Sequence, residues 1–147
     1  MAMASGLYGI TLRDQFDASQ IGVDLVSDTV KYQFVSDAHT PNFDTHSTET
    51  DITNEVTGTG YTTGGEALAT KSLGVASGVL TFDAADVSLS TTTLASVEGV
   101  VIFDDTPTTP TADPLILAVD FGSTYSTTAG TFAITWNASG IFTITKT

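Results

Sequence analysis

The chain has 147 residues, of which 17 are acidic and 4 are basic, so its formal net charge is −13 at pH 7. Because 41% of the residues are hydrophobic, the composition fits a single folded domain and excludes a disordered chain. The acidic charge argues against direct binding of nucleic acid, and the lack of cysteine excludes disulfides and cysteine-based zinc sites.

The first segment, residues 1–27, is predicted to be a short helix or an extended arm in front of the β domain. Helix is slightly favoured over residues 7–19, ending near Ser19, because Leu12 and Phe16 form an i,i+4 apolar pair. The apolar residues of this segment are the candidate protein interface, although they could instead cap the domain's own core. These residues are Leu7, Tyr8, Ile10, Leu12 and Phe16.

The remainder, residues 28–147, is predicted to be one β domain, because threonine and valine are abundant and 13 glycines can supply turns. Residues 29–35 alternate apolar and polar side chains, which is typical of a half-buried strand. Residues 36–51 and 57–65 are rich in turn-forming residues and are predicted to be loops. Seven further strands are expected at residues 66–73, 78–82, 87–90, 98–103, 115–121, 131–136 and 141–145.

The last two expected strands form the clearest hairpin, with residues 137–140 as its loop. Seven to nine short strands separated by turn signals indicate an all-β fold, an antiparallel sandwich or barrel. Most acidic residues, among them Asp51, Asp104 and Asp105, fall in the predicted loops and turns, which indicates a solvated coat around an apolar core. An attachment surface is therefore expected where that coat is thin, in the first sixteen residues.

No catalytic constellation emerges from the sequence, and we expect no enzyme activity, no cofactor and no metal site. His39 and His46 share a loop with several carboxylates and could bind a divalent ion. Their spacing fixes no ligand set, so surface loop residues are the preferred interpretation. No apolar run approaches the ~20 residues of a membrane span, and the N-terminus lacks the pattern of a signal peptide.

Several blocks of the chain resemble a family of small virion proteins of tailed bacteriophages. The match runs in one register over residues 28–145. Its blocks are Thr40–His46, Asn54–Gly65, Phe82–Val87, Val101–Pro107, Pro114–Ile116, Val119–Gly122, Gly130–Phe132 and Trp136–Phe142. One departure is visible after His46, where an aromatic residue followed by acidic ones is expected and this chain has Ser47–Asp51.

This resemblance implies a non-enzymatic structural protein of the phage particle. The interpretation that we favour is a capsid decoration (cement) protein on the outside of the head; the alternative is a minor tail or tail-fibre-associated protein. The expected partners are the major capsid protein, further copies of this chain as a dimer or trimer, or both, with no nucleic acid and no membrane. The expected location is the exterior of the phage head, after assembly in the host cytoplasm.

Overall fold

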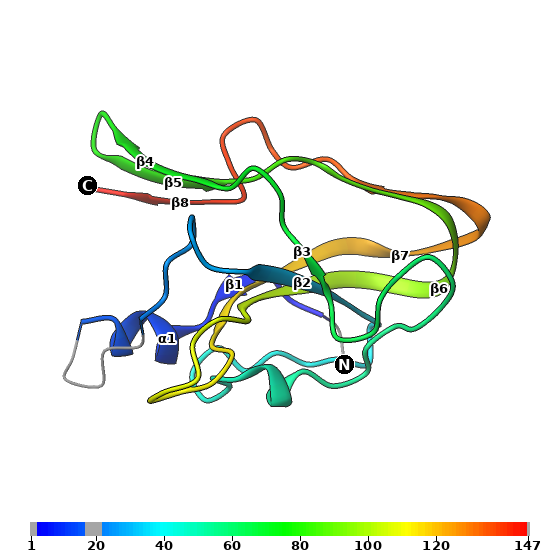
Figure 1. The fold of residues 1–147 in the computed structure, drawn as a ribbon, viewed down its shortest axis with the longest axis horizontal. Helices are drawn as coiled ribbons and strands as arrows, with labels where there is room; N and C mark the ends of the chain where they lie inside the picture. The colour runs from blue at the N-terminus through cyan, green and yellow to red at the C-terminus, as the bar shows by residue number, and fades with distance from the viewer. Residues whose placement is uncertain (1–2, 17–21, 147) are drawn as a thin grey trace.

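The computed structural model describes residues 3–16 and 22–146 and has two antiparallel sheets with one short helix (Figure 1). The all-β fold predicted from composition and turn signals is confirmed, and of the two predicted architectures, sandwich or barrel, the structure is a sandwich. The five-stranded sheet has the order β1-β7-β6-β2-β3, and the three-stranded sheet has the order β4-β5-β8. The elements are β1 (Gly6–Leu7), α1 (Gly9–Asp14), β2 (Val30–Val35), the 3-10 helix η1 (Glu49–Asp51), β3 (Glu66–Ala67), β4 (Ser72–Ala76), β5 (Val79–Asp83), β6 (Val87–Asp104), β7 (Leu115–Ile134) and β8 (Phe142–Thr145).

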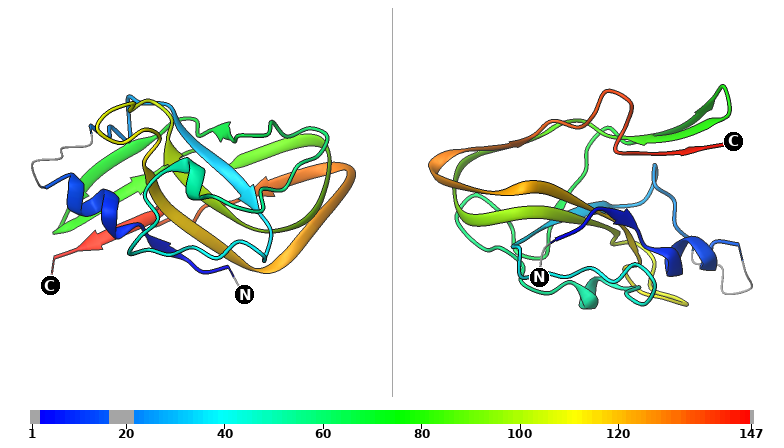
Figure 2. Two further views of the ribbon diagram at one scale, coloured as in Figure 1. Left: turned by 90° about the horizontal axis from the view of Figure 1, so that it is seen from below. Right: turned by 180° about the vertical axis from the view of Figure 1, so that it is seen from behind.

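Two long strands, β6 and β7, form the frame of the sandwich. Each joins two of the short strands expected from sequence, so the prediction of separate strands at residues 87–90 and 98–103, and at 115–121 and 131–136, is wrong. Repeated register shifts between Leu89 and Gly99 mark β-bulges, which bend a strand and increase its twist. The ribbon therefore curves from one layer into the other and serves both (Figures 1 and 2).

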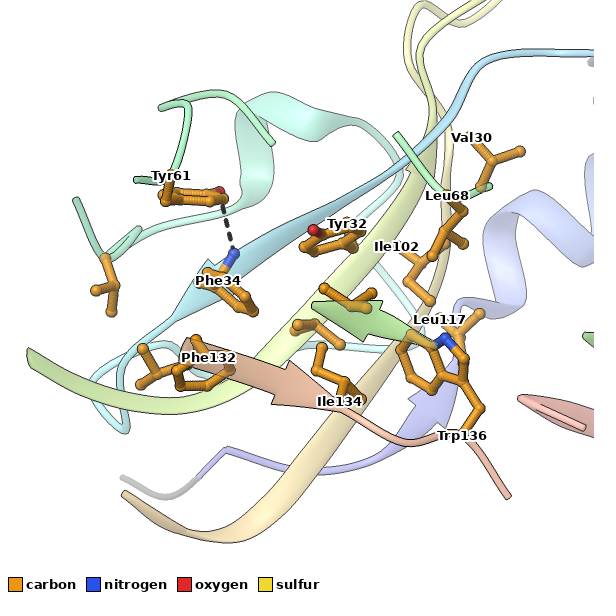
Figure 3. Close-up of a cluster of buried hydrophobic side chains, with 14 of the residues drawn as sticks. Val30, Tyr32, Phe34, Tyr61, Leu68, Ile102, Leu117, Phe132, Ile134 and Trp136 are labelled. Atoms are coloured by element: carbon orange, nitrogen blue, oxygen red, sulfur yellow. Dashed lines mark hydrogen bonds between the residues drawn. The ribbon is translucent and has the colours of Figure 1, made fainter. Parts of the chain in front are cut away.

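The main core lies between the two layers (Figure 3). Phe34 of β2 is fully buried, and its ring centroid is 4.8 Å from those of both Tyr61 and Phe132. The Tyr61 hydroxyl also accepts a hydrogen bond from the Phe34 backbone N–H at 3.2 Å. Trp136 is a further buried member of this cluster, and its indole N–H donates to the Ala85 carbonyl at 3.1 Å.

A second, smaller core lies on the other face of the five-stranded sheet. Its buried members are Met3, Tyr8, Val35, Val101, Phe103, Leu115 and Ala118. Phe43 and Ile52, from the loop that follows β2, pack against it. Because this loop covers the face, Gln33 is only 3% exposed, and the prediction that β2 is half-buried is wrong.

The C-terminal hairpin predicted from sequence is also corrected. The turn itself forms, since the Gly140 N–H donates to the Asn137 carbonyl at 2.8 Å. However, β8 pairs with β5, placing Phe142 opposite Phe82 and Ile144 opposite Leu80. The end of β7 pairs with β6 instead, so the two arms of the expected hairpin belong to different sheets.

The N-terminal segment is a short strand followed by a short helix. β1 pairs with β7, with Leu7 opposite Leu117, and α1 covers Gly9–Asp14. The helix predicted over residues 7–19 is therefore shorter at its start, and its predicted end near Ser19 lies outside the described residues. Pairing of β1 makes this segment an edge of the five-stranded sheet.

Candidate interaction surface

The predicted interface residues divide into two groups in the structure. Tyr8 is 1% exposed, its N–H donates to the Ile116 carbonyl at 3.0 Å, and its ring lies 5.3 Å from that of Phe43. Burial raises the pKa of the Tyr8 hydroxyl above its usual range. Leu7 and Ile10 are half-buried. Tyr8 therefore belongs to the domain's own core and is inaccessible to a partner.

Leu12 and Phe16 are the exposed members of the predicted interface. Leu12 is 42% exposed and Phe16 is 85% exposed. Exposure of large apolar side chains is informative when they gather in one place. Within the described residues the other exposed large hydrophobic side chains are Val26, Leu73, Val75, Tyr125 and Ile144.

Leu12, Leu73 and Ile144 line one apolar groove between α1 and the three-stranded sheet. The groove has a volume of about 140 Å³. Its other walls are Leu7, Tyr8, Thr11, Gln15, Val23, Leu25, Leu80, Ile116 and Phe142. In Figure 1 the small sheet extends above α1 at this end of the molecule. The exposed N-terminal side chains thus continue into a larger apolar surface.

The charge coat is thin around this groove. Residues 9–16, 22–28, 71–83 and 142–146 together carry three basic and four acidic side chains, a net charge of −1 in a chain of net charge −13. Lys31, the remaining basic residue, lies elsewhere and pairs with Asp105 at 2.7 Å. An apolar, nearly neutral surface is the kind that a protein partner can cover without burying unpaired charge.

The other wall of this groove could not be found from the N-terminal sequence. Leu73 and Ile144 lie more than 60 and 130 positions beyond Leu12 along the chain. Each belongs to an alternating strand pattern that also fits an ordinary core strand. The sequence signal here is the uncharged run Ser72–Phe82, which includes the end of the strand expected at 66–73 and the whole strand expected at 78–82.

The loop that carries His39 and His46 holds the polar residues considered above as a possible metal site. His39 is fully buried, its Nδ1 lies 3.2 Å from Thr53 Oγ1, and its ring centroid is 6.4 Å from that of His46. Burial lowers the pKa of His39 and favours the neutral ring. Asp51 is engaged in capping η1, where its carboxylate accepts the Ser47 and Thr48 N–H groups. Over residues 3–16 and 22–146, no three His, Cys, Asp or Glu side chains gather as metal ligands do.

One carboxylate expected in the solvated coat is buried instead. Asp104 ends β6 and has no exposed surface. Burial, reinforced by the nearby Asp28 carboxylate, raises the pKa of Asp104 to about 7. The Thr106 N–H donates to one oxygen at 3.1 Å. The Asp104 N–H donates to the Pro114 carbonyl at 3.0 Å, so β6 extends one residue past the strand end predicted at residue 103. The interpretation of Asp104 as a solvated loop charge is therefore wrong.

No family model, curated protein or solved structure matches this chain. In the described parts of the chain, no helix is long and apolar enough to cross a membrane.

Proposed function

We propose that this chain is a non-enzymatic structural protein of a tailed-bacteriophage particle and that it decorates the outside of the head. The observation that carries the proposal is the ordered series of sequence blocks that resemble phage virion proteins, above all Asn54–Gly65. A role in the particle requires a stable scaffold and contact surfaces, and needs no catalytic centre.

The contacts of the Asn54–Gly65 block support a structural role for its most distinctive residues. The Glu55 carboxylate accepts hydrogen bonds from the Tyr61 hydroxyl at 2.8 Å and from the Gly64 N–H at 2.7 Å. A Cβ at Gly58 would overlap the Thr93 carbonyl oxygen, so only glycine fits there. These residues hold the loop against β2 and β6. Their structural contacts explain why these residue types occur here, and no bound substrate is needed to explain them.

The apolar groove and the exposed side chains beside it supply an attachment surface for the shell. Leu12 and Phe16 project from α1 and the turn that follows it, where the surface is nearly neutral. Binding the assembled shell, but not its free subunits, would stabilise the particle by mass action. The partner in this proposal is the major capsid protein.

The proposal is tested on particles of the phage that encodes the chain, prepared with and without the gene. Loss of the protein should lower the temperature at which packaged DNA is released, and added purified protein should restore it. Immunogold labelling should decorate heads in many copies. Unchanged release temperatures, or label confined to tails, would overturn the assignment; the second result would favour the minor tail alternative.

The attachment surface is tested by adding variants back to particles that lack the protein. Leu12→Ser with Phe16→Ser should weaken binding by at least tenfold, because both side chains are exposed and apolar. Tyr125→Ser is the matched control, since Tyr125 is 50% exposed and does not line the groove. Equal binding of both variants would place the attachment surface elsewhere.

A further inference from the structure

The β4 edge of the three-stranded sheet carries none of the features that usually prevent pairing with another chain. β4 is its outer strand, and all five of its residues, Ser72–Ala76, are exposed. Proteins usually protect such an edge with lysine, proline or a bulge, because its unpaired backbone groups can pair with another chain. β4 has none of these, and no charge occurs between Lys71 and Asp83.

The backbone groups that β4 presents at its edge can be assigned from the hairpin that it forms with β5. Ser77 and Gly78 have φ values of 51° and 80°, as in a two-residue type I′ turn, whose flanking residues form a hydrogen-bonded pair. Hydrogen-bonded and non-bonded pairs then alternate along the ladder. The Phe82 carbonyl accepts from Ile141 N–H on the β8 side at 2.8 Å, which agrees with this phase. Leu73 and Val75 therefore direct their N–H and C=O groups to the free edge.

The side chains of the same two residues are also incompletely covered. Leu73 lies opposite Phe82, and Val75 lies opposite Leu80, so all four share one face of the sheet. Phe82 is fully buried in the main core, whereas Leu73 is 43% exposed and Val75 is 73% exposed. The apolar face thus extends past the core and stops at the open edge.

We propose that two copies of this chain pair through β4 about a two-fold axis centred on Gly74. Leu73 then lies opposite Val75 of the second copy, and both present outward backbone groups, so the two strands exchange four main-chain hydrogen bonds. Gly74 faces its own counterpart at a non-hydrogen-bonded position, where Cα atoms are about 4.5 Å apart. Leu73 and Val75 of the two copies continue one apolar face across the joined sheets.

Charge favours a second copy at this edge over other faces of the same chain. Two chains of net charge −13 repel each other, and β4 and the turn after it place no charged side chain on the contact line. The pairing is independent of the phage assignment, because it depends only on this edge.

A five-residue strand buries less than the roughly 1,200 Å² of stable complexes. The dimer is therefore weak in dilute solution and is favoured where copies are held at high local concentration. A trapping assay is consequently more informative than an elution volume.

The cysteine-free chain permits such an assay with single cysteines. Gly74→Cys should form an intermolecular disulfide under mild oxidation, because the two Cα atoms lie within bridging distance. A Cβ at Gly74 would meet no atom of residues 3–16 or 22–146 within 4 Å. Leu73→Cys is the register control, since two copies of residue 73 would be about 8 Å apart, beyond the reach of a disulfide. Thr143→Cys, exposed on the opposite edge strand, controls for random collision.

Gly74→Cys should cross-link at least ten times faster than either control, and adding Val75→Lys should reduce its rate to theirs. Sedimentation of the cysteine-free chain at increasing concentration gives an independent reading, in which Val75→Lys should lower the association constant at least tenfold. Circular dichroism verifies that each variant is folded. Equal cross-linking rates for the three cysteines, or no effect of Val75→Lys in either assay, would overturn the proposal. Monomeric Gly74→Cys at all concentrations would also overturn it and leave the edge to a strand of another protein.

Discussion

A substitution at Tyr8 tests whether the N-terminal segment unfolds together with the rest of the domain or is a separate arm. Its side chain is 1% exposed and packs 5.3 Å from the Phe43 ring in the second core. Truncating a large buried aromatic side chain costs about 3–5 kcal/mol. We therefore expect Tyr8→Ala to lower the free energy of unfolding by about 3–4 kcal/mol, and the melting temperature by roughly 6–16 °C for a domain of this size.

Two further variants give this prediction a sharper form. Among the described residues the buried Tyr8 hydroxyl has no hydrogen-bond partner, so Tyr8→Phe should leave stability unchanged or raise it by up to about 1 kcal/mol. Phe16→Ala, at a side chain that is 85% exposed, should change stability by less than about 0.5 kcal/mol. Urea unfolding is followed by circular dichroism and by the fluorescence of Trp136, the single tryptophan. A Tyr8→Ala variant within about 1 kcal/mol of the parent would refute the assignment of this segment to the core.

Three other predictions concern stability. Because the pKa of Asp104 is raised to about 7 in the folded protein, folding takes up a proton between about pH 4 and 7. The free energy of unfolding should therefore fall by at most about 4 kcal/mol as pH rises over this range. Asp104→Asn should flatten the dependence of melting temperature on pH, and an unchanged dependence would contradict the assignment of this effect to Asp104. Glu55→Ala leaves two donors unpaired and should cost about 2 kcal/mol in urea unfolding, whereas a change below about 0.5 kcal/mol would mean that water replaces the carboxylate. Gly58→Ala should lower the free energy of unfolding by about 1–3 kcal/mol, because its Cβ would overlap the Thr93 carbonyl. Gly74→Ala is the control, since its Cβ meets open space among the described residues, and it should melt within a few degrees of the parent. Similar melting temperatures for the two variants would disprove the steric argument.

The strands could be predicted where side-chain alternation is regular and were misjudged where the backbone bends. Residues 91–97 carry neither alternation nor a turn glycine, and they separated two expected strands. In the structure Thr91 and Ser96 take positive φ values of 57°, and the chain continues through these bulges as β6. A bulge adds a residue on one strand and so shifts the period of two on which strand prediction depends.

Strand partners were harder to predict than strands. The local turn at residues 137–140 was recognised, but β8 pairs with β5, some 60 residues earlier. The pairing of Phe142 with Phe82 depends on which apolar faces meet across the sandwich. A local sequence pattern identifies the apolar face of one strand, but it does not show which other apolar face packs against it.

The candidate surface was half predictable for the same reason. Apolar spacing identified all five N-terminal residues, but it could not separate Tyr8, which Phe43 covers, from Phe16, which the described residues leave exposed. Burial is decided by what a distant segment supplies. The uncharged strand opposite them, β4, became significant only once the fold placed it at an open edge.

The position of the acidic groups relates this open edge to the net charge. The acidic loops after β2 and β6 lie below the five-stranded sheet in Figure 1, whereas β4 lies in the opposite layer. Packed sheets are about 10 Å apart, so the carboxylates of these two loops are farther from the edge than the roughly 8 Å Debye length at 0.15 M salt. At low ionic strength the charge of −13 on each copy opposes pairing through β4, and salt relieves that repulsion. Association through this edge should therefore strengthen between 0.01 and 0.15 M salt, the opposite of an interface built on ion pairs. Sedimentation at the two salt concentrations distinguishes these cases, and weaker association at high salt would exclude an uncharged strand as the contact.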